Sequence, residues 1–479
     1  MENLWMIFSY FVIFAVLIFS FDDLFIDFIA LVFGLKPKKL SEEELGDMHS
    51  MPQKRIAIMI ANWHEADIIE RMIHGNIGRI DYLNYDFFLG VYPNDTKTVA
   101  AAKRLESIYS MVKVVVNPKP GPTSKGQMLN EIVHFITSIE IQSKKFYDIF
   151  MLQDSEDIIH PLSLKQVNFE MEVVDFLQTP VFSLPTKWTD LTRAVYIDEF
   201  TECHTKDMLV RSFLKGGVPS AGVGTAMSHL FVSEIQLLQK GKLLKEDTLT
   251  EDYHLGLMAH RLGYDSKFVC NYHQKKNSID YIATREYFPA STQTSIRQKT
   301  RWTLGISFQG YDNLKWSKTL AENYFLWRDR RCFLNGILVL CSYILTISFV
   351  AYYLINRQWP EFLAADKALY AAVSTNFYLM AVRLVQRFRL VNELNGLKVA
   401  LLIPVRGVLA NYINTLASFK AYKVHINSKK TGNQPHWVKT AHELPTFFGA
   451  EPVILIKTEK LNILREVNLE NEKQTEQII

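Results

Sequence analysis

Hydrophobic positions at the start of the chain form a run of nearly membrane-spanning length, "LWMIFSYFVIFAVLIF", followed by Asp22, Asp23 and a more amphipathic stretch. No basic residues precede the run and no small-residue cleavage site follows it, which favours a retained anchor over a signal peptide. Lysines follow the segment whereas only Glu2 precedes it, so the positive-inside rule places the N-terminus outside and the next residues in the cytoplasm. We predict a transmembrane anchor with an amphipathic segment over residues 1–35.

The pattern changes near residue 52, where short apolar runs begin to alternate with amphipathic helices. The apolar runs are "RIAIMIA", "FFLGVYP", "VKVVVN" and "DIFMLQD". Strands that alternate with helices are typical of a largely parallel sheet covered by helices, in which ligands bind beyond the carboxyl ends of the strands. We predict an α/β domain over residues 52–320, with its functional side chains placed just after the strands.

Membrane-like patterning returns after residue 309. The run "CFLNGILVLCSYILTISFVAYYLI" is long enough to span a bilayer, and a second apolar stretch at 368–382 leads to Arg383, Arg387 and Arg389. This arrangement predicts a transmembrane hairpin over residues 332–386, with both ends in the cytoplasm.

The next segment, 398–425, carries polar residues at near-helical spacing. A polar stripe favours an interfacial helix, or one packed on protein, over a lipid-facing span. If the helix lies on the surface, the segment 430–450, with "HWVKTAHELP", can fold over a cytoplasmic site; if the helix crosses, this segment lies outside. The residues alone leave open whether 430–450 folds over the site or forms a simple surface turn. A charged tail follows over 451–479.

Composition agrees with a soluble domain combined with membrane segments. The chain has 479 residues, of which 48% are hydrophobic and 22% charged, between the values expected for a soluble domain and for a pure transporter. The net charge of +3 is small and spread out, so no nucleic-acid partner is indicated. The four cysteines lack any paired metal-ligand spacing and are predicted to be reduced.

Acidic residues stand at two places where they can carry chemistry. Asp154 and Glu156 follow the fourth predicted strand and can share one hard cation with substrate phosphates. Glu251 and Asp252 occur in "TLTEDYHLG", where one carboxylate could take a proton from an acceptor hydroxyl. Helix capping explains each pair about equally well from these residues alone.

Three further motifs have both a binding and a structural interpretation. Residues Gln298, Arg301 and Trp302 can share one helix face. There the arginine suits phosphate oxygens and the tryptophan offers an apolar plate, or the two anchor a helix at a membrane surface. Lys125 lies in a Gly/Pro/Ser-rich loop without the Walker spacing. Gly222 and Gly224 either let the backbone approach a ligand or serve turns.

Taken in order, these motifs resemble the family-two inverting glycosyltransferases related to cellulose and hyaluronan synthases. That family has the series Asp, Asp-x-Asp, Thr-Glu-Asp and Gln-x-x-Arg-Trp, and here the series is Asp95, Asp154-Ser-Glu156, Thr250-Glu251-Asp252 and Gln298-Lys-Thr-Arg301-Trp302. Stretches such as "YPNDTKT", "GPTSKGQMLN" and "HWVKTAHELP" are similar to the phage adsorption protein B branch. The resemblance implies a cytoplasmic α/β GT-A domain, Rossmann-like with a mixed, mainly parallel sheet, plus transmembrane and interfacial helices.

The resemblance also implies roles for individual residues. Asp252 would be the general base, with Glu251 beside it. Nucleotide and donor contacts would come from Asn62, Glu65, Asp95, Lys125, Asp154, Gln298 and Arg301. Trp302, Gly222 and Gly224 would face the acceptor. By similarity to the gating segment of cellulose synthases, residues 430–450 would be a gating-type loop, with the gate formed by Trp437, Lys439, Thr440 and His442. Asp154 and Glu156 would hold Mg²⁺ or Mn²⁺; because Asp157 follows Glu156, the choice between these two carboxylates stays open.

The implied reaction is transfer of a sugar from a UDP-sugar, with inversion, to a growing surface or exported glycan. An N-acetylhexosamine, such as N-acetylmannosamine, is the donor that the resemblance suggests. Transfer of one sugar to a lipid carrier, and a catalytically silent scaffold of an export or phage-receptor assembly, are the two alternatives.

The predicted partners follow from the membrane segments. We expect a multi-pass protein of the bacterial inner membrane, in contact with the lipid bilayer. About three membrane spans are too few to enclose a polar pore, so a homodimer or an outer-envelope export partner is expected. The charged tail does not resemble a folded domain, and we expect no cyclic di-GMP domain in these residues.

Overall fold

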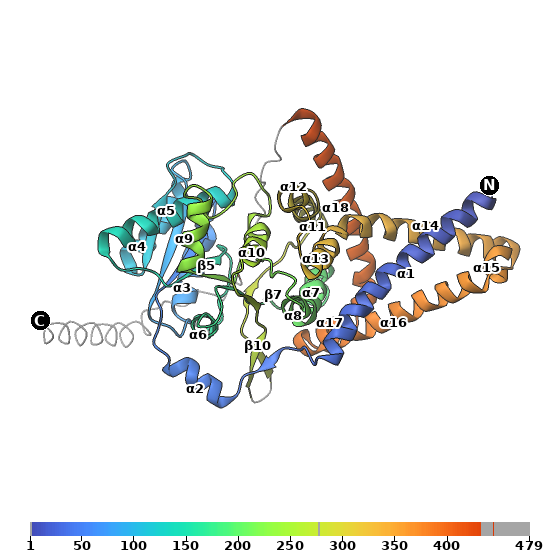
Figure 1. Cartoon of the computed structure of the whole chain (residues 1–479), viewed down its shortest axis with the longest axis horizontal. Helices are drawn as coiled ribbons and strands as arrows, with labels where there is room; N and C mark the ends of the chain where they lie inside the picture. The colour runs from blue at the N-terminus through green and yellow to red at the C-terminus, as the bar shows by residue number, and fades with distance from the viewer. Residues whose placement is uncertain (1, 276–277, 433–443, 445–479) are drawn as a thin grey trace, which may run out of the picture.

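The computed structural model describes residues 2–275, 278–432 and residue 444. An α/β domain lies at one side, and three long helices extend away from it at the other side (Figure 1).

A seven-stranded sheet forms the centre of the α/β domain, in the order β4-β3-β2-β5-β8-β6-β9. In chain order the strands are β2 (Ile56–Ala61), β3 (Tyr85–Val91), β4 (Val112–Val116), β5 (Ile149–Gln153), β6 (Phe176–Gln178), β8 (Thr225–Ser228) and β9 (Ser266–Phe268). Strand β2 pairs in parallel with β3 and β5, and β3 with β4, whereas β8 is antiparallel to β5 and β6. The predicted mixed, mainly parallel sheet is therefore confirmed.

Alternating side chains of the strands are buried on both faces of this sheet. On β2, Ile56, Ile58 and Ile60 pack with α3 (Ala66–Ile77) and α4 (Thr96–Ile108). Ala57 and Met59 pack with α5 (Lys125–Ser143), α9 (His229–Leu238) and α10 (Glu251–Arg261) on the opposite face. Because successive strand residues point to opposite faces, a continuous apolar run such as "IAIMIA" is what a sheet covered on both sides requires.

Shorter elements complete the domain. Strands β7 (Val181–Ser183) and β12 (Thr284–Glu286) form a parallel pair, and β1 (Lys38–Lys39), β10 (Asn271–Lys275) and β11 (Ser278–Tyr281) form a small sheet. The remaining helices of the domain are α2 (Glu42–Ser50), α6 (Ser163–Glu170), α7 (Leu191–Glu202), α8 (Met208–Phe213), α11 (Thr292–Thr303), α12 (Gly310–Leu314) and α13 (Leu320–Arg330). Two π-helical turns, Cys203–Asp207 and Leu304–Gln309, extend α7 and α11.

Three helices among the described residues are long and apolar enough to cross a membrane: α1 (Glu2–Val32), α14 (Cys332–Asn356) and α16 (Lys367–Asn395). They lie side by side in Figure 1, and α15 (Glu361–Ala365) joins the last two. Helix α1 continues without a break through Asp22 and Asp23, where the sequence suggested a change to an amphipathic segment. Helix α18 (Ile403–Thr431), which follows α17 (Leu397–Ala400), packs against α14, α11 and α7.

Ion pairs join α1 to the rest of the molecule. Asp22 contacts Arg328, and Arg331 lies 2.7 Å from both Asp22 and Asp23. Asp23 also contacts Arg383 of α16. An acid inside a membrane-length helix is costly unless a cation pairs with it, and these pairs explain why α1 tolerates its aspartates.

Helix α7 carries acids that hold three different helices. Asp198 receives two hydrogen bonds, of 2.8 and 2.7 Å, from the fully buried Arg406 of α18. Glu199 contacts Lys299 of α11, and Glu202 contacts Arg387 of α16. Helix α7 therefore connects the membrane-length helices to α11, the helix that bears the Gln-x-x-Arg-Trp motif.

Candidate active site

A cavity of about 140 Å³ lies at the carboxyl end of the central strands. Its lining includes ten of the predicted site residues: Asn62, Glu65, Lys125, Asp154, Glu156, Glu251, Asp252, Gln298, Arg301 and Trp302. Asp95, Gly222 and Gly224 are not part of the lining, although Ala221 and Val223 are. The predicted gating residues Trp437, Lys439, Thr440 and His442 lie outside the described residues.

Lys125 is fixed at the start of α5. The side chain of Ser124 caps the helix by accepting a hydrogen bond from the backbone N–H of Gln127. The Nζ atom of Lys125 lies 2.5 Å from Oδ1 of Asp154 and 3.4 Å from the carbonyl oxygen of Gly222. Burial disfavours the charged lysine, but Asp154, Glu251 and Asp252 outweigh this effect and raise its pKa. Lys125 therefore stays a cation among the carboxylates of the pocket.

The three acids in the turn after β5 lie in different surroundings. The backbone N–H of Asp154 donates a 2.6 Å hydrogen bond to Oδ2 of Asp157, and Asp157 is fully buried behind the pocket. Burial raises the pKa of Asp157, and the charges of Glu286, Asp154 and Glu156 add to this effect. Asp154 and Glu156 line the pocket, whereas Asp157 does not. Between the two carboxylates that the sequence left open, Glu156 is the one that faces the cavity.

Glu251 and Asp252 form the first turn of α10, and the preceding Thr250 makes no side-chain cap. Burial and the neighbouring Asp252 raise the pKa of Glu251 to about 7. Burial raises the pKa of Asp252 as well, although Lys125 and Arg301 act in the opposite direction. A carboxylate with a raised pKa accepts a proton more readily than an exposed one.

Gly222 lies directly against Asp252. Its φ of +80° is in the left-handed region, and a Cβ atom at this position would stand 2.4 Å from Oδ2 of Asp252. Only glycine fits here without displacing the carboxylate. The predicted close approach of the backbone is therefore toward the candidate base and not toward the open cavity.

Helix α11 presents Gln298, Arg301 and Trp302 to the pocket. Oε1 of Gln298 and Nε of Arg301 are buried without a hydrogen-bond partner. Buried polar atoms without partners are rare in folded proteins, and these two lie where a bound ligand could satisfy them. Lys299, between them in the sequence, points away from the cavity to Glu199. Trp302 packs against Tyr196 and Phe200, with ring centroids 6.1 Å apart in both pairs.

Two predicted residues stabilise loops around the pocket. Asn62 is fully buried; its Nδ2 atom donates to the carbonyl oxygens of Ile60 and Gly90, and its Oδ1 atom accepts from Ser155. Asp95 caps α4 and accepts a 2.7 Å hydrogen bond from the backbone N–H of His64. Burial alone would raise the pKa of Asp95, but these hydrogen bonds lower it. A nucleotide contact by either residue stays a prediction.

Glu286 is a pocket residue that sequence reasoning missed. It ends β12, and this strand pairs with β7 so that Glu286 lies beside Ser183 and lines the cavity. Trp63 and Tyr92 also line it. The available signal was an acid just before the Gln-x-x-Arg-Trp helix, but the short strand that positions it has no distinct apolar pattern.

Comparison with known proteins assigns the chain to a family. The sequence pattern of the family "Glycosyltransferase like family 2" matches residues 52–305. The bacteriophage adsorption protein B of Escherichia coli strain K12 is 33% identical over 489 aligned residues, covering 97% of this chain and 65% of that protein. The bacteriophage N4 adsorption protein B of Escherichia coli O157:H7 matches with the same identity and coverage. The chain thus spans just under two thirds of the length of these relatives.

The fold has a counterpart among solved structures. A mannosyltransferase from Pyrobaculum calidifontis, determined in complex with GDP-mannose and Mn²⁺, superposes with a TM-score of 0.50 at 12% identity, covering 88% of this chain and 99% of that one. This likeness supports the GT-A-like fold. With the match over residues 52–305, it follows that the chain belongs to glycosyltransferase family 2.

Proposed function

We propose that this protein is a metal-dependent inverting glycosyltransferase that transfers a sugar from a UDP-sugar to a glycan, with Asp252 as the general base. The observation that carries the proposal is the convergence of Asp252, Asp154 and Arg301 on one pocket, although they come from three separate elements. Helix capping alone gives no reason for these residues to meet.

The charges of the pocket suit a nucleoside diphosphate bound with a divalent cation. Asp154 and Glu156 offer hard oxygen ligands. Among the described residues, no group of three or more His, Cys, Asp or Glu side chains is placed to hold a metal alone. Mg²⁺ and Mn²⁺ sites of glycosyl- and phosphoryl-transfer type take one or two carboxylates and complete the shell with phosphates and water, so the residues present fit. When bound, the cation would offset the charge that develops on the leaving diphosphate.

The side chains of the pocket divide the chemistry between them. Arg301 donates a hydrogen bond to a diphosphate oxygen through its unpaired buried Nε. Gln298 donates to the diphosphate through its amide N–H groups, and its unpaired Oε1 accepts a hydrogen bond from a ligand hydroxyl or a water. Asp252 takes the proton from an acceptor hydroxyl while the oxygen of that hydroxyl attacks the anomeric carbon of the donor sugar. The bond to the UDP oxygen breaks in the same displacement, so the configuration inverts and no covalent sugar intermediate forms. Trp302 provides the apolar plate on which the acceptor sugar rests.

The three membrane-length helices support a reaction that takes place at a bilayer. We propose that the catalytic domain faces the cytoplasm of a bacterial inner membrane, where nucleotide sugars are available, and that α1 enters from the outside. The donor is proposed to be a UDP-N-acetylhexosamine, such as the N-acetylmannosamine derivative. Export of a polymer would then need a second copy or an envelope partner, because the three membrane-length helices of the described residues cannot seal a polar pore.

The experiment is UDP release by purified full-length protein, with a panel of UDP-sugars and with Mn²⁺ or Mg²⁺. We expect release with one class of sugar, abolished by chelation and by Asp252→Asn. Product analysis would distinguish a glycan from a single sugar on a lipid. No release with any UDP-sugar, in the presence of both metals and of cell-derived glycan and lipid acceptors, would contradict the proposal.

A further inference from the structure

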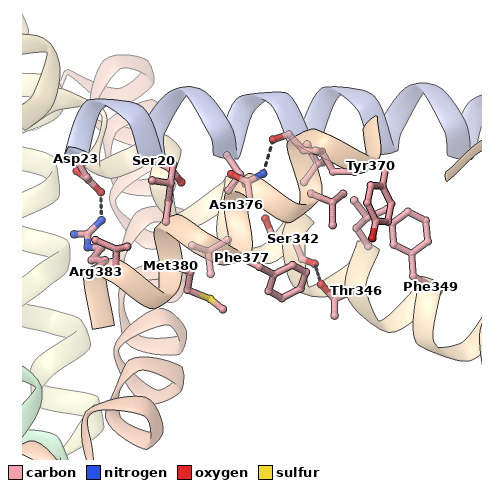
Figure 2. A pocket seen from close by; sticks show the side chains of 18 of the residues that line it. Ser20, Asp23, Ser342, Thr346, Phe349, Tyr370, Asn376, Phe377, Met380 and Arg383 are labelled. Carbon is pink, nitrogen blue, oxygen red and sulfur yellow. Dashed lines mark hydrogen bonds and ion pairs between the residues drawn. The ribbon is translucent and has the colours of Figure 1, made fainter. Parts of the chain in front are cut away.

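A second cavity, far larger than the first, lies between the three membrane-length helices. Its volume is about 900 Å³, within the range of about 300–1,000 Å³ typical of ligand pockets. Helices α1, α14 and α16 supply its walls, as Figure 2 shows. None of the residues assigned to the glycosyltransferase reaction lines it.

The lining is amphipathic along its length. Val16, Leu345, Phe349 and Val373 are among the many apolar side chains that line the cavity. At the end next to the α/β domain, Asp23 and Arg383 meet in an ion pair, while Phe349 and Tyr370 mark the other end (Figure 2). An occupant therefore needs a long apolar part and a polar head at the Asp23 end.

Arg383 has capacity for a further anion. Its side chain is 45% exposed and lines the cavity, while its partner Asp23 is 18% exposed. Asp23 also receives a 2.7 Å hydrogen bond from Arg331. Because Arg331 keeps Asp23 paired, Arg383 can bind a phosphate without leaving a buried acid alone. A guanidinium suits this role because its fork matches phosphate oxygens.

The acid beside this arginine selects the type of head group. Asp23 and Asp27 both line the same end of the cavity, and Arg331 and Lys206 pair with them. The charges at this end are therefore close to balanced, which favours a head group with no net charge. A zwitterionic head complements both signs: its phosphate pairs with Arg383 and its ammonium donates hydrogen bonds to Asp23. A quaternary ammonium lacks N–H donors and would bind less well.

We propose that this cavity binds one membrane phospholipid with a primary ammonium head group, of the phosphatidylethanolamine type. One acyl chain lies between α1, α14 and α16, and the phosphate contacts Arg383. The site is separate from the sugar-transfer pocket, so the proposal does not depend on the donor or acceptor of that reaction.

The test counts bound lipids by native mass spectrometry of the full chain. The protein is reconstituted in turn with phosphatidylethanolamine, phosphatidylcholine and phosphatidylglycerol that carry the same acyl chains, then released in mild detergent. We expect one tightly retained phosphatidylethanolamine and several-fold lower retention of the other two lipids. Arg383→Gln should lower retention by about tenfold, the usual effect of losing a hydrogen bond to a charged group.

Cavity-filling variants distinguish this site from lipid on the outer surface. Val373→Trp fills the cavity from α16 and should abolish the retained lipid. Val385→Trp is the matched control, because Val385 lies on the same helix, is 68% exposed and does not line the cavity. If Val373→Trp does not accumulate, Val350→Trp fills the cavity from α14. Equal retention of the three lipids, or full retention by the filled variants, would overturn the proposal.

Discussion

Buried charge collects in two regions of this molecule, and the two are balanced differently. In the candidate active site the carboxylates outnumber the bases: the acids are Glu65, Asp154, Glu156, Glu251, Asp252 and Glu286, and the bases are Lys125 and Arg301. At the junction around α7 and α1, acids meet arginine or lysine partners, as in the pairs Asp22–Arg328, Asp198–Arg406 and Glu202–Arg387.

The ionisation of Glu251 and Glu202 reflects this difference, whereas burial raises the pKa of Asp198 in spite of its pairing with Arg406. In the pocket, burial and the adjacent Asp252 raise the pKa of Glu251 to about 7. At the junction, burial opposes ionisation of Glu202 too, but Arg387 and Lys206 lower its pKa to about 2. A surplus of buried acid is costly unless it serves a ligand, whereas a paired acid can serve as a structural tie. The balance of acids and bases therefore distinguishes a candidate binding site from a cluster of structural ion pairs more clearly than the number of acids does.

Breaking a balanced pair should have the largest effect on stability. Arg406→Met removes the partner of Asp198 and leaves that carboxylate buried and unpaired, at a cost of about 3–5 kcal/mol. The midpoint of thermal unfolding in detergent should fall strongly. The double variant Asp198→Leu/Arg406→Met removes both charges and should recover much of the loss. An unchanged midpoint for Arg406→Met alone would mean that α18 is not held by this pair.

Removing one acid from the unbalanced pocket should affect turnover and not stability. Asp252→Asn keeps the size of the side chain but removes the proton acceptor, so UDP release should fall by about 10²-fold or more. The unfolding midpoint should stay the same or rise, because the variant has one buried acid fewer. UDP-sugar affinity and the unfolding midpoint are measured beside turnover. Turnover near that of the parent would remove Asp252 from the proposed mechanism.

Substitutions of Asp154 and Asp157 test whether the metal binds to the acids that line the cavity. Asp154→Asn should raise the Mn²⁺ concentration for half-maximal UDP release by about tenfold, the effect expected for a lost contact to a charged group. Asp157→Asn is the control, because an Asn oxygen can still accept the hydrogen bond from the backbone of Asp154. Its Mn²⁺ dependence should match the parent. The reverse pattern would assign the metal to Asp157 and not to the acids that line the pocket.

Local sequence patterns identified most of the side chains that line the candidate active site, but they gave little about the junction. Each apolar run that the sequence analysis quoted is a strand of the sheet, and Asp154 and Glu156 follow β5. Because the carboxyl ends of parallel strands meet at one edge of the sheet, residues that follow the strands could be expected in one site. Periodicity on one helix predicted that Gln298, Arg301 and Trp302 could share a site. These inferences need only neighbours in sequence or a rule of the fold.

The junction depends on partners that are far apart in the chain. Asp198 and Arg406 are 208 residues apart, and Lys206 pairs with Asp27 across 179 residues. No periodic pattern marks such pairs, so the sequence suggested a polar stripe on α18 without showing what it contacts. Glu286 was missed for the same reason, since its position depends on the pairing of β12 with β7. Long-range pairing, and not local propensity, placed the residues that the sequence left unassigned.

The smallest expected effect is a pH dependence that Glu251 should show and Glu202 should not. The pKa of Glu251 is raised from 4.5 to about 7 in the folded protein, so the folded state holds this proton more tightly than the unfolded state does. Its stabilising contribution is therefore complete below about pH 4.5 and is lost as the pH rises through 7. In Glu251→Gln the neutral amide keeps the uncharged form at every pH. Measured with chelator between pH 5 and 8, the unfolding midpoint of this variant should rise relative to that of the parent as the pH increases.

Glu202→Gln is the contrasting case: the pKa of Glu202 is about 2, so the difference in unfolding midpoint from the parent should stay constant over the same interval. A constant difference for Glu251→Gln as well would show that the surplus of acid does not shift ionisation near neutral pH, and the contrast between pocket and junction would then rest on geometry alone.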